Sequence, residues 1–355
     1  MDDPPEILLA SIESLSEHYD NFEQNRRGAN GYLIFARNKV TGVQIAIKFY
    51  AGAVGETRHD EPKQLSAIQS KNVLPILDAR NVSDEWGYFI TPRCFEGDID
   101  DLVARQPSAL SAIDFALGIC NGVSAIHKMK MVHRDLKPAN IVLLDGAPQI
   151  ADFGSVRQLG STGKVNASQH SILFRPPESF ASCEYSEQGD IYQIGVVTYQ
   201  LLGGTLSYDG ESYFTAHQRK QYLAMTDYVD QSVFTNSVIR GRCESGKLIN
   251  FDSLPPWVTG SAKRLLRSIV HHDCGRRTAT IADVGAALTQ MRASMSNWTW
   301  DGDLARLVTG DRTVELRVSA DAPTIYEPYL SKQGGPFRRT PSVEAATLSV
   351  LVGKF

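Results

Sequence analysis

The chain has 355 residues, of which 42% are hydrophobic and 21% are charged, a composition that fits a folded enzyme with a sizeable core. Its 36 Lys and Arg against 40 Asp and Glu give a net charge of -4, so no overall bias toward nucleic acid is expected. The five cysteines form no C-x-x-C pair, which indicates neither zinc nor disulfides and favours a reducing, cytoplasmic compartment.

The first part of the chain reads as a short lead-in followed by a strand-rich region. Residues 1–20 are acidic at the start and lack a basic leader, and no apolar run approaches ~18 residues, so we expect neither export nor a membrane span. Residues 21–93 contain a glycine turn between two strands, the alternating strand VQIAIK that ends at Lys48, and one helix.

Residues 94–295 are expected to form a mainly helical region. Two apolar segments stand out, 111–129 and 189–204, and the second is apolar enough to be buried all round. The apolar face of the first segment is formed by Ile113, Ala116, Ile119, Cys120, Val123 and Ile126.

The most informative stretch is VHRDLKPANIV at 132–142, followed by IADFG at 150–154. Pro138 prevents a simple helix, so the stretch reads as a shaped loop, and IVLL and QIA are short strands that bring it close to Asp152. Asn140 and Asp152 offer the hard oxygen ligands that Mg²⁺ prefers, and Asp135 remains as a base. Together these groups indicate phosphate chemistry.

These two motifs resemble the catalytic loop and metal-binding triplet of the eukaryotic-like (Hanks-type) Ser/Thr protein kinase family. The resemblance implies an α+β, two-lobed fold with an antiparallel sheet in the small lobe and a mainly helical large lobe. It also implies transfer of the γ-phosphate of ATP to Ser or Thr hydroxyls of protein substrates, with Mg²⁺ (or Mn²⁺) as the cation and autophosphorylation as one outcome.

The resemblance assigns separate tasks to the charged residues of the loop. Asp135 would accept or orient the proton of the substrate hydroxyl, and Lys137 would steady the transferred phosphoryl group. Asn140 and Asp152 would hold the magnesium ion against the phosphates. A lysine two residues after the catalytic aspartate favours Ser or Thr over Tyr as the acceptor.

On the phosphate side of ATP, the resemblance implies contacts from Lys48, with Glu61 as its helix partner, and from the backbone at Gly28 and Gly31. Two departures from the family occur here. The first glycine of the usual G-x-G-x-x-G pattern is Arg26, and Pro62 follows Glu61 directly. Proline is acceptable only in a first helical turn, so we predict a helix that begins near Glu61 and a less secure pairing with Lys48.

On the adenosine side, the segment after the strand 87–92 aligns with the hinge of the family. Thr91 would guard the back of the adenine pocket, Pro92 would contribute only its carbonyl, and Cys94 would supply the backbone N–H. Asp98 would bind the ribose. The apolar walls would come from Leu33, Ala46 and Val142.

The segment from Asp152 to Glu178 is polar in its middle, as is typical of a mobile loop. The resemblance implies an ion pair between Glu178 and Arg277, a hydroxyl of Ser171 that touches the catalytic loop, and a helix cap by Asp190. Arg134 either holds a phosphate on this loop or simply braces the loop. The candidate phosphorylation sites are Ser155, Ser161, Thr162 and Ser168.

Two segments have no counterpart in the usual family pattern. Residues 204–256 are longer than expected and rich in cations, which favours a solvated insertion over a docking site for an acidic partner. Their charges are His217, Arg219, Lys220, Arg240, Arg242 and Lys247.

Residues 296–355 form a C-terminal extension. Alternation at Val314, Leu316 and Val318 predicts a strand, and 346–355 is a second strand candidate, so a small β-unit is expected, with an irregular stretch between. That stretch contains Arg338, Arg339, Thr340 and Ser342, which resemble a site for a basophilic kinase. Three hypotheses remain open: a flap packed on the kinase, an inhibitory tail in the cleft, and a tail that docks a partner.

Three functional classes follow from these observations. An active Ser/Thr protein kinase is favoured because every charged catalytic position is present. A pseudokinase scaffold is the first alternative, supported by Arg26 and Pro62. A small-molecule phosphotransferase of related fold is the second alternative, and Lys137 and the RPPE segment at 175–178 argue against it.

Overall fold

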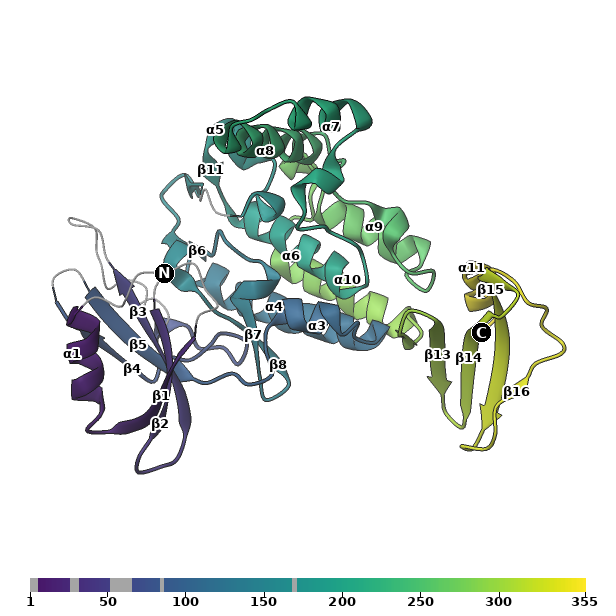
Figure 1. Cartoon of the computed structure of the whole chain (residues 1–355), viewed down its shortest axis with the longest axis horizontal. Helices are drawn as coiled ribbons and strands as arrows, with labels where there is room; N and C mark the ends of the chain where they lie inside the picture. The colour runs from purple at the N-terminus through teal and green to yellow at the C-terminus, as the bar shows by residue number, and fades with distance from the viewer. Residues whose placement is uncertain (1–5, 26–31, 52–65, 84–85, 168–170) are drawn as a thin grey trace.

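A computed structural model of the chain describes residues 6–25, 32–51, 66–83, 86–167 and 171–355 (Figure 1). These residues form a small lobe built on an antiparallel sheet, a mainly helical large lobe, and a β-unit at the end of the large lobe that lies away from the small lobe (Figure 1). The predicted two-lobed α+β fold with a C-terminal extension is confirmed.

The small lobe is a five-stranded antiparallel sheet in the order β1-β2-β3-β5-β4, covered by one helix. Side chains of strand β3 alternate between the two faces of the sheet. Ile45, Ile47 and Phe49 enter the core, so Ala46 and Lys48 point to the opposite face. The elements are α1 Glu6–Leu15, β1 Tyr19–Asn25, β2 Tyr32–Asn38, β3 Gln44–Ala51, β4 Asp78–Asn81 and β5 Trp86–Pro92.

The predicted lead-in contributes to this core. Most of it is the helix α1, and Leu8 and Leu15 of that helix are buried against the sheet. The seven-residue spacing of the two leucines brings them onto one face after two turns. The small lobe therefore includes residues that the sequence pattern assigned to a separate segment.

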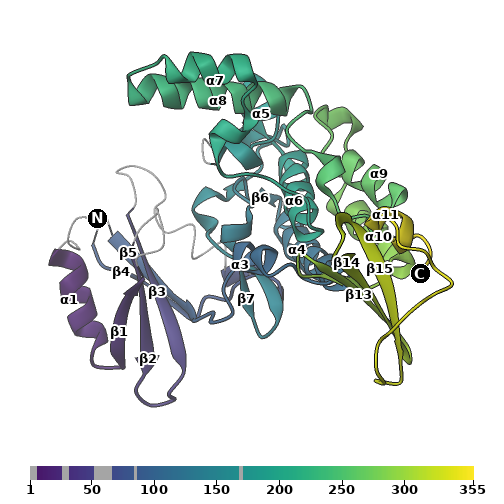
Figure 2. The same ribbon diagram turned by 45° about the vertical axis from the view of Figure 1, so that its right-hand side comes forward.

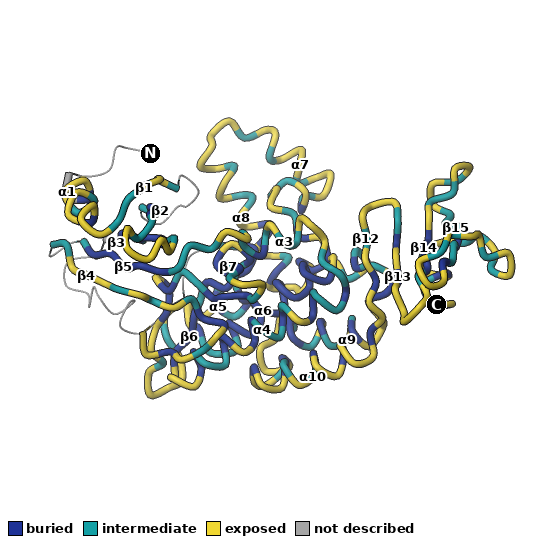
Figure 3. Tube along the Cα trace, turned by 90° about the horizontal axis from the view of Figure 1, so that it is seen from below, coloured by how far each residue is buried: buried dark blue, intermediate teal, exposed yellow. Residues whose placement is uncertain are grey.

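The large lobe surrounds a single hydrophobic core, seen as the dark centre of Figure 3. Its helices are α3 Ile99–Ala104, α4 Ala109–Lys128, α5 Glu178–Ser182, α6 Glu187–Leu201, α7 Ala216–Leu223, α8 Tyr228–Glu244, α9 Gly260–Ile269 and α10 Ile281–Ser294. Its short strand pairs are β6 Met131–Val132 with β9 Arg157–Gln158, β7 Ile141–Leu144 with β8 Ala147–Ile150, and β10 Val165–Asn166 with β11 Glu184–Tyr185.

Helix α4 is the central helix of this lobe. All six residues of its predicted apolar face are buried, and the helix packs against α6, α10 and β8. By length and composition alone, α4 could also cross a membrane, but half of its apolar window is already buried inside the lobe. Its apolar character is thus accounted for by the core.

The long connection 204–256 is folded into helices. α7 and α8 lie side by side and project from the large lobe (Figure 2). α7 has no buried residue, whereas the second half of α8 buries Val238, Ile239 and Cys243 against the lobe. The predicted solvated insertion therefore describes α7 and the start of α8, while the end of α8 belongs to the core.

The C-terminal extension is a five-stranded antiparallel sheet in the order β12-β13-β14-β15-β16, followed by one short helix. The strand predicted through Val314, Leu316 and Val318 is present as β14. The elements are β12 Trp298–Trp300, β13 Leu304–Thr309, β14 Arg312–Ser319, β15 Ala322–Lys332, β16 Arg338–Arg339 and α11 Leu348–Val352.

One expectation about the extension is wrong, a second is met only in part, and one of the three open hypotheses is not supported. The second strand candidate is the helix α11, because Leu348, Leu351 and Val352 have helical spacing and Leu351 is buried against the sheet. The irregular stretch holds a short strand, β16, that pairs with β15. The hypothesis of an inhibitory tail in the cleft fails because the extension packs on the large lobe at the end remote from the small lobe (Figure 1).

Tryptophan packing joins the extension to the large lobe. Trp298 is 1% exposed and stacks on Trp257, with ring centroids 6.2 Å apart and planes at 19°. Both rings belong to the core of the large lobe. The extension is therefore packed as a structural part of the kinase-like body, in agreement with the flap hypothesis.

We expect Trp298→Ala to lower the free energy of unfolding by about 3–5 kcal/mol, because it removes a buried aromatic ring and leaves a cavity beneath β12. Chemical denaturation of the full chain measures the change. Thr299→Ala is the matched control, since the neighbouring side chain on the same strand is exposed. Equal denaturation midpoints for the two variants would contradict the structural role of the extension.

Candidate active site

The loop 133–140 connects β6 to β7 and is shaped by local backbone features. Arg134 has a left-handed backbone with φ of 70°, and Pro138–Asn140 form a short 3₁₀ turn after the extended Lys137. β7 pairs with β8, which leads directly to Asp152. The predicted loop and the second aspartate are therefore brought together by one short hairpin.

Asp135 lies at the centre of the loop and is 3% exposed. Its Oδ2 accepts hydrogen bonds from Lys137 Nζ at 2.9 Å and from Asn140 Nδ2 at 2.9 Å. Asn140 Nδ2 also donates to the Asp135 carbonyl at 2.8 Å. Since the amide nitrogen of Asn140 is engaged in both bonds, its oxygen is the atom with which this residue can ligate a cation.

Asp152 faces this cluster from the end of β8 and has a left-handed backbone with φ of 57°. Lys48 Nζ from the small lobe lies 2.6 Å from its Oδ1. Burial opposes ionisation of Asp152, but the positive charge and hydrogen bond of Lys48 outweigh it and lower the pKa of the carboxyl. The residue is therefore an anion at neutral pH, positioned between the two lobes.

The donor set fits a hard divalent cation that shares its shell with phosphates. Among the described residues, no group of three or more His, Cys, Asp or Glu is arranged to hold a metal ion. One carboxylate of Asp152 and one amide oxygen of Asn140 leave most of the shell to other ligands. Mg²⁺ is typically coordinated in this way, by one or two protein oxygens together with waters and substrate phosphates.

A buried aspartate fixes the backbone of the loop from behind. Asp190, in the first turn of α6, accepts the N–H of His133 at 2.9 Å and the N–H of Arg134 at 3.0 Å. It also binds His127 Nε2 at 2.8 Å and the hydroxyl of Tyr185 at 2.9 Å. Burial disfavours the charged form of Asp190, but these hydrogen bonds lower the pKa of its carboxyl, and the bond from His127 contributes most to the lowering.

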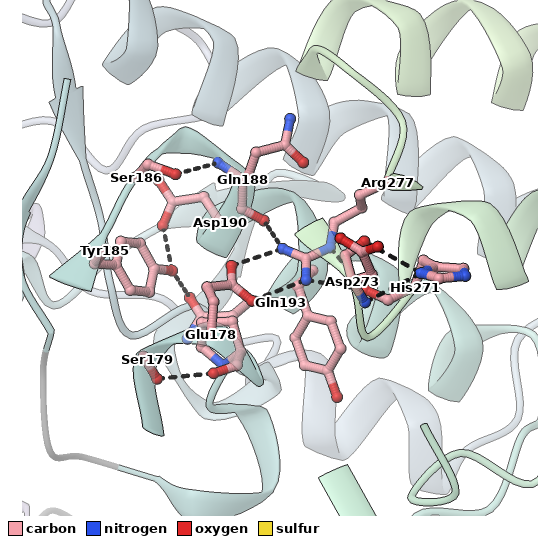
Figure 4. A network of polar contacts seen from close by, with 12 residues as sticks. Glu178, Ser179, Tyr185, Ser186, Gln188, Asp190, Gln193, His271, Asp273 and Arg277 are labelled. Atoms are coloured by element: carbon pink, nitrogen blue, oxygen red, sulfur yellow. Dashed lines mark hydrogen bonds and ion pairs between the residues drawn. The ribbon is translucent and has the colours of Figure 1, made fainter. Parts of the chain in front are cut away.

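The cap assigned to Asp190 needs a correction. The residue that caps α6 is Ser186, whose side chain accepts the N–H of Gln188, as Figure 4 shows. Asp190 lies inside the helix, at the end of its first turn, and binds the backbone of the 133–140 loop instead. Its predicted contact with the loop backbone is confirmed.

Strands of the small lobe and β7 frame the predicted adenosine pocket. Ala46 pairs with Thr91 across β3 and β5, and Leu33 pairs with Lys48 across β2 and β3. On the large-lobe side, Val142 forms an isolated bridge with Asp98. The strands therefore gather the three predicted wall residues and the predicted back residue around one region between the lobes.

The hinge residues themselves have distinct surroundings. Thr91 is buried and its Oγ1 donates to the carbonyl of Pro92 at 3.3 Å. Cys94 is partly buried, and burial raises the pKa of its thiol to about 11, so the thiol is neutral. Asp98 caps α3 through Oδ1, which accepts the N–H of Asp101, and this leaves Oδ2 as its second acceptor.

Comparison with known proteins decides the family. The protein kinase domain model matches residues 20–287, more than half of the chain. The chain belongs to the protein kinase family. The resemblance of its catalytic loop is thus confirmed at the level of the whole domain.

The kinase is similar to several curated proteins. It is 32% identical over 166 residues to the serine/threonine-protein kinases PknA of Corynebacterium glutamicum, covering 43% of this chain and 34% of that protein. It is 26% identical over 258 residues to mitogen-activated protein kinase HOG1B of Wallemia ichthyophaga, covering 70% and 67%. It is 28% identical over 188 residues to cyclin-dependent kinase 7 of Dictyostelium discoideum, covering 49% and 52%. The chain spans about a third of the length of the two bacterial relatives that it matches.

The segment that follows Asp152 in the kinase is braced by Arg134. The guanidinium donates from Nε to the Ser155 carbonyl at 2.6 Å and from Nη1 to the Asn166 carbonyl at 2.5 Å. Burial lowers the pKa of Arg134 to about 10, so it remains a cation at neutral pH. The structure shows the brace, and the binding of a phosphate by Arg134 stays a prediction.

The candidate phosphorylation sites differ in access. Ser155 is 8% exposed inside the 3₁₀ turn Phe153–Ser155, so it is a poor acceptor in this conformation. Ser161 and Thr162 are exposed in a turn between β9 and β10. Ser168 lies outside the described residues, and the contact predicted for the Ser171 hydroxyl stays a prediction.

The ion pair predicted between Glu178 and Arg277 is confirmed (Figure 4). Two guanidinium nitrogens meet the two carboxylate oxygens at 2.8 and 2.9 Å, and the Arg277 side chain is fully buried. Arg277 also donates to the carbonyls of Gln188 and His271. A buried guanidinium with this many partners ties α5 to the segment before α10.

Several predicted kinase features lie outside the described residues. They are Gly28 and Gly31 of the glycine turn, with Arg26, and Glu61 with Pro62. Of the helix predicted to begin near Glu61, only Ser66 and Ala67 are described, and both are helical. The partner of Lys48 on the small-lobe side therefore stays a prediction.

The sequence reasoning missed the polar residues that support the loop from the interior. Asp190 was predicted, but His127, Tyr185 and Gln193 were not. The Oε1 atom of Gln193 accepts the N–H of Leu136 at 2.8 Å. The available signal was a histidine and a glutamine on the buried faces of apolar helices. Buried polar groups need hydrogen-bond partners, so each one points to a fixed contact.

Proposed function

We propose that the chain is an ATP-dependent protein kinase that phosphorylates Ser or Thr hydroxyls of protein substrates. The observation that carries the proposal is the meeting of Lys48 and Asp152 beside the hydrogen-bonded cluster of Asp135, Lys137 and Asn140. Phosphoryl transfer depends on positioning and charge neutralisation, and this arrangement supplies both.

Each residue has a task in the proposed reaction. Asp135 orients the acceptor hydroxyl and receives its proton, while Lys137, held 2.9 Å from Asp135 Oδ2, is placed to balance charge on the transferred group. Lys48 would contact the α and β phosphates of ATP. Asn140 and Asp152 would hold the magnesium ion, which would neutralise charge on the phosphates.

The alternatives have less support. A pseudokinase commonly lacks the lysine, the base or the metal aspartate, whereas Lys48, Asp135 and Asp152 are all present and close together in the kinase-like arrangement. A small-molecule phosphotransferase is not expected to have the segment that Glu178 and Arg277 fix.

Transfer of radiolabelled phosphate from ATP to generic acceptor proteins tests the proposal. We expect label on Ser and Thr, none after chelation of divalent cations, and recovery when MgCl₂ or MnCl₂ is added, because the phosphates require a cation that Asn140 and Asp152 can hold. Asp135→Ala is the inactive control. Labelling that persists in the presence of chelator, or in the control, would contradict the proposed mechanism.

We further propose a cytoplasmic location. The five cysteines are free in the structure, two of them exposed, which suits a reducing compartment. Cell fractionation with an antibody against the full chain tests this. Recovery in an exported or membrane fraction would contradict it.

A further inference from the structure

A cavity of about 920 Å³ lies between the large lobe and the C-terminal extension. Its walls come from α3, from residues 200–206 at the end of α6, from Trp257, and from Trp300 and Leu348 of the extension. Neither Asp135 nor Lys137 lines it. The cavity is therefore separate from the phosphate site, and the extension forms part of its wall through Trp300 and Leu348.

The charged groups of this cavity have one sign. Asp100 and Asp252 line it, and no Lys, Arg or His is among its described lining residues. α6 also ends at the wall, with Leu201 and Leu202 lining the cavity. The last carbonyls of a helix carry partial negative charge, which adds to the two carboxylates.

A buried amide in the wall lacks a donor. Gln200 is 4% exposed and lines the cavity, and within the described part of the chain no group donates to its Oε1. Buried polar atoms in native proteins nearly always have a partner, so the Gln200 amide is an unusual polar group in this wall.

The remaining walls are apolar and aromatic. Trp257 and Trp300 lie 6.1 Å apart between ring centroids, and Val103 and Leu348 complete this side. Tryptophan faces attract cations as well as apolar groups. The volume is within the range of ligand sites for small molecules.

We propose that this cavity binds an organic cation, a primary ammonium group carried on an apolar body. The ammonium lies near Asp252 and Asp100, whose Oδ1 already accepts the Tyr208 hydroxyl at 2.6 Å, and the apolar body lies against the tryptophans that line the cavity. A bound ligand would contact both the lobe and the extension.

The test uses 2-phenylethylammonium as the probe, with neutral 2-phenylethanol and anionic 3-phenylpropionate as comparisons, on the full chain. Calorimetry measures affinity, and tryptophan fluorescence reports the place, because Trp257 and Trp300 line the cavity and Trp298 stacks on Trp257, whereas Trp86 is in the small lobe. We expect saturable binding of the ammonium, at least about ten-fold tighter than the alcohol, and no binding of the carboxylate.

Three variants locate the site. Asp252→Asn removes an exposed lining charge and should weaken binding about three- to ten-fold, and Ala104→Phe should abolish binding by filling the mouth from an exposed position on α3. Asp321→Asn, in an exposed turn of the extension, is the control and should bind as the unaltered chain does. The proposal is overturned if no probe binds, if the alcohol binds as tightly as the ammonium, or if Asp252→Asn and Ala104→Phe bind like the control.

Discussion

Asp135→Asn is expected to lower the rate of phosphoryl transfer by at least about 10²-fold while ATP affinity changes little. The asparagine keeps the size of the side chain and can still accept one hydrogen bond from Lys137 or Asn140. It cannot take the proton of the acceptor hydroxyl, and it leaves the Lys137 ammonium without the carboxylate that lies 2.9 Å from it. The loss therefore belongs to the chemical step rather than to nucleotide binding.

Single-turnover transfer of label from ATP measures the rate, and calorimetric titration of nucleotide measures binding separately. Asp145→Asn is the matched control, because Asp145 is exposed in the neighbouring turn between β7 and β8 and has a left-handed backbone that asparagine adopts readily. An Asp135→Asn variant that retains the rate of this control would show that another group is the base.

The sequence predicted the parts of the site that are contiguous in the chain. The loop 133–140 and Asp152 are separated by one hairpin, so their meeting follows from two short strands and a turn. Lys48 could be predicted as the end of an alternating strand, but its 2.6 Å contact with Asp152 joins residues more than one hundred positions apart. That contact depends on how the two lobes are placed, which a local pattern does not contain.

Other outcomes depended on packing that only the folded chain reveals. The 346–355 segment contains β-branched residues and leucines that suit a strand. In the structure it adds no strand to the sheet; residues 348–352 form α11, which packs on the sheet through the buried Leu351. The sequence left two hypotheses for Arg134, holding a phosphate or bracing the loop, because both need the same positive charge. The brace depends on the carbonyls of Ser155 and Asn166, which the fold brings to the guanidinium.

Asp190→Asn is expected to lower both stability and activity, because one side chain fixes several donors that the sequence places far apart. Each carboxylate oxygen accepts two bonds: Oδ2 from His127 and the His133 N–H, Oδ1 from Tyr185 and the Arg134 N–H. An asparagine turns one of these acceptors into a donor that faces two donors. The cost should be about 3–5 kcal/mol of the free energy of unfolding, as for a buried charge network that loses a partner.

The loss of activity should exceed what unfolding explains. Arg134 has a left-handed backbone next to the proposed base Asp135, and a strained conformation of this kind persists only while its surroundings hold it. Without the second acceptor of Asp190, the 133–135 backbone relaxes and the base moves from its position. At temperatures where the variant is fully folded, the transfer rate should still be at least about ten-fold lower, since small displacements of reacting groups are costly.

The pH dependence of stability separates this role from a general packing defect. Folding lowers the pKa of Asp190, so its contribution is present above the ordinary carboxyl range and is lost as pH falls below about 4 toward the lowered value. Chemical denaturation between pH 7 and pH 3 should therefore show a smaller acid-induced loss for Asp190→Asn than for the unaltered chain. Glu187→Gln, in the same turn of α6, is the control and should follow the unaltered chain. Parallel pH curves for Asp190→Asn and this control would contradict the assignment of Asp190 as the charged anchor of the catalytic loop.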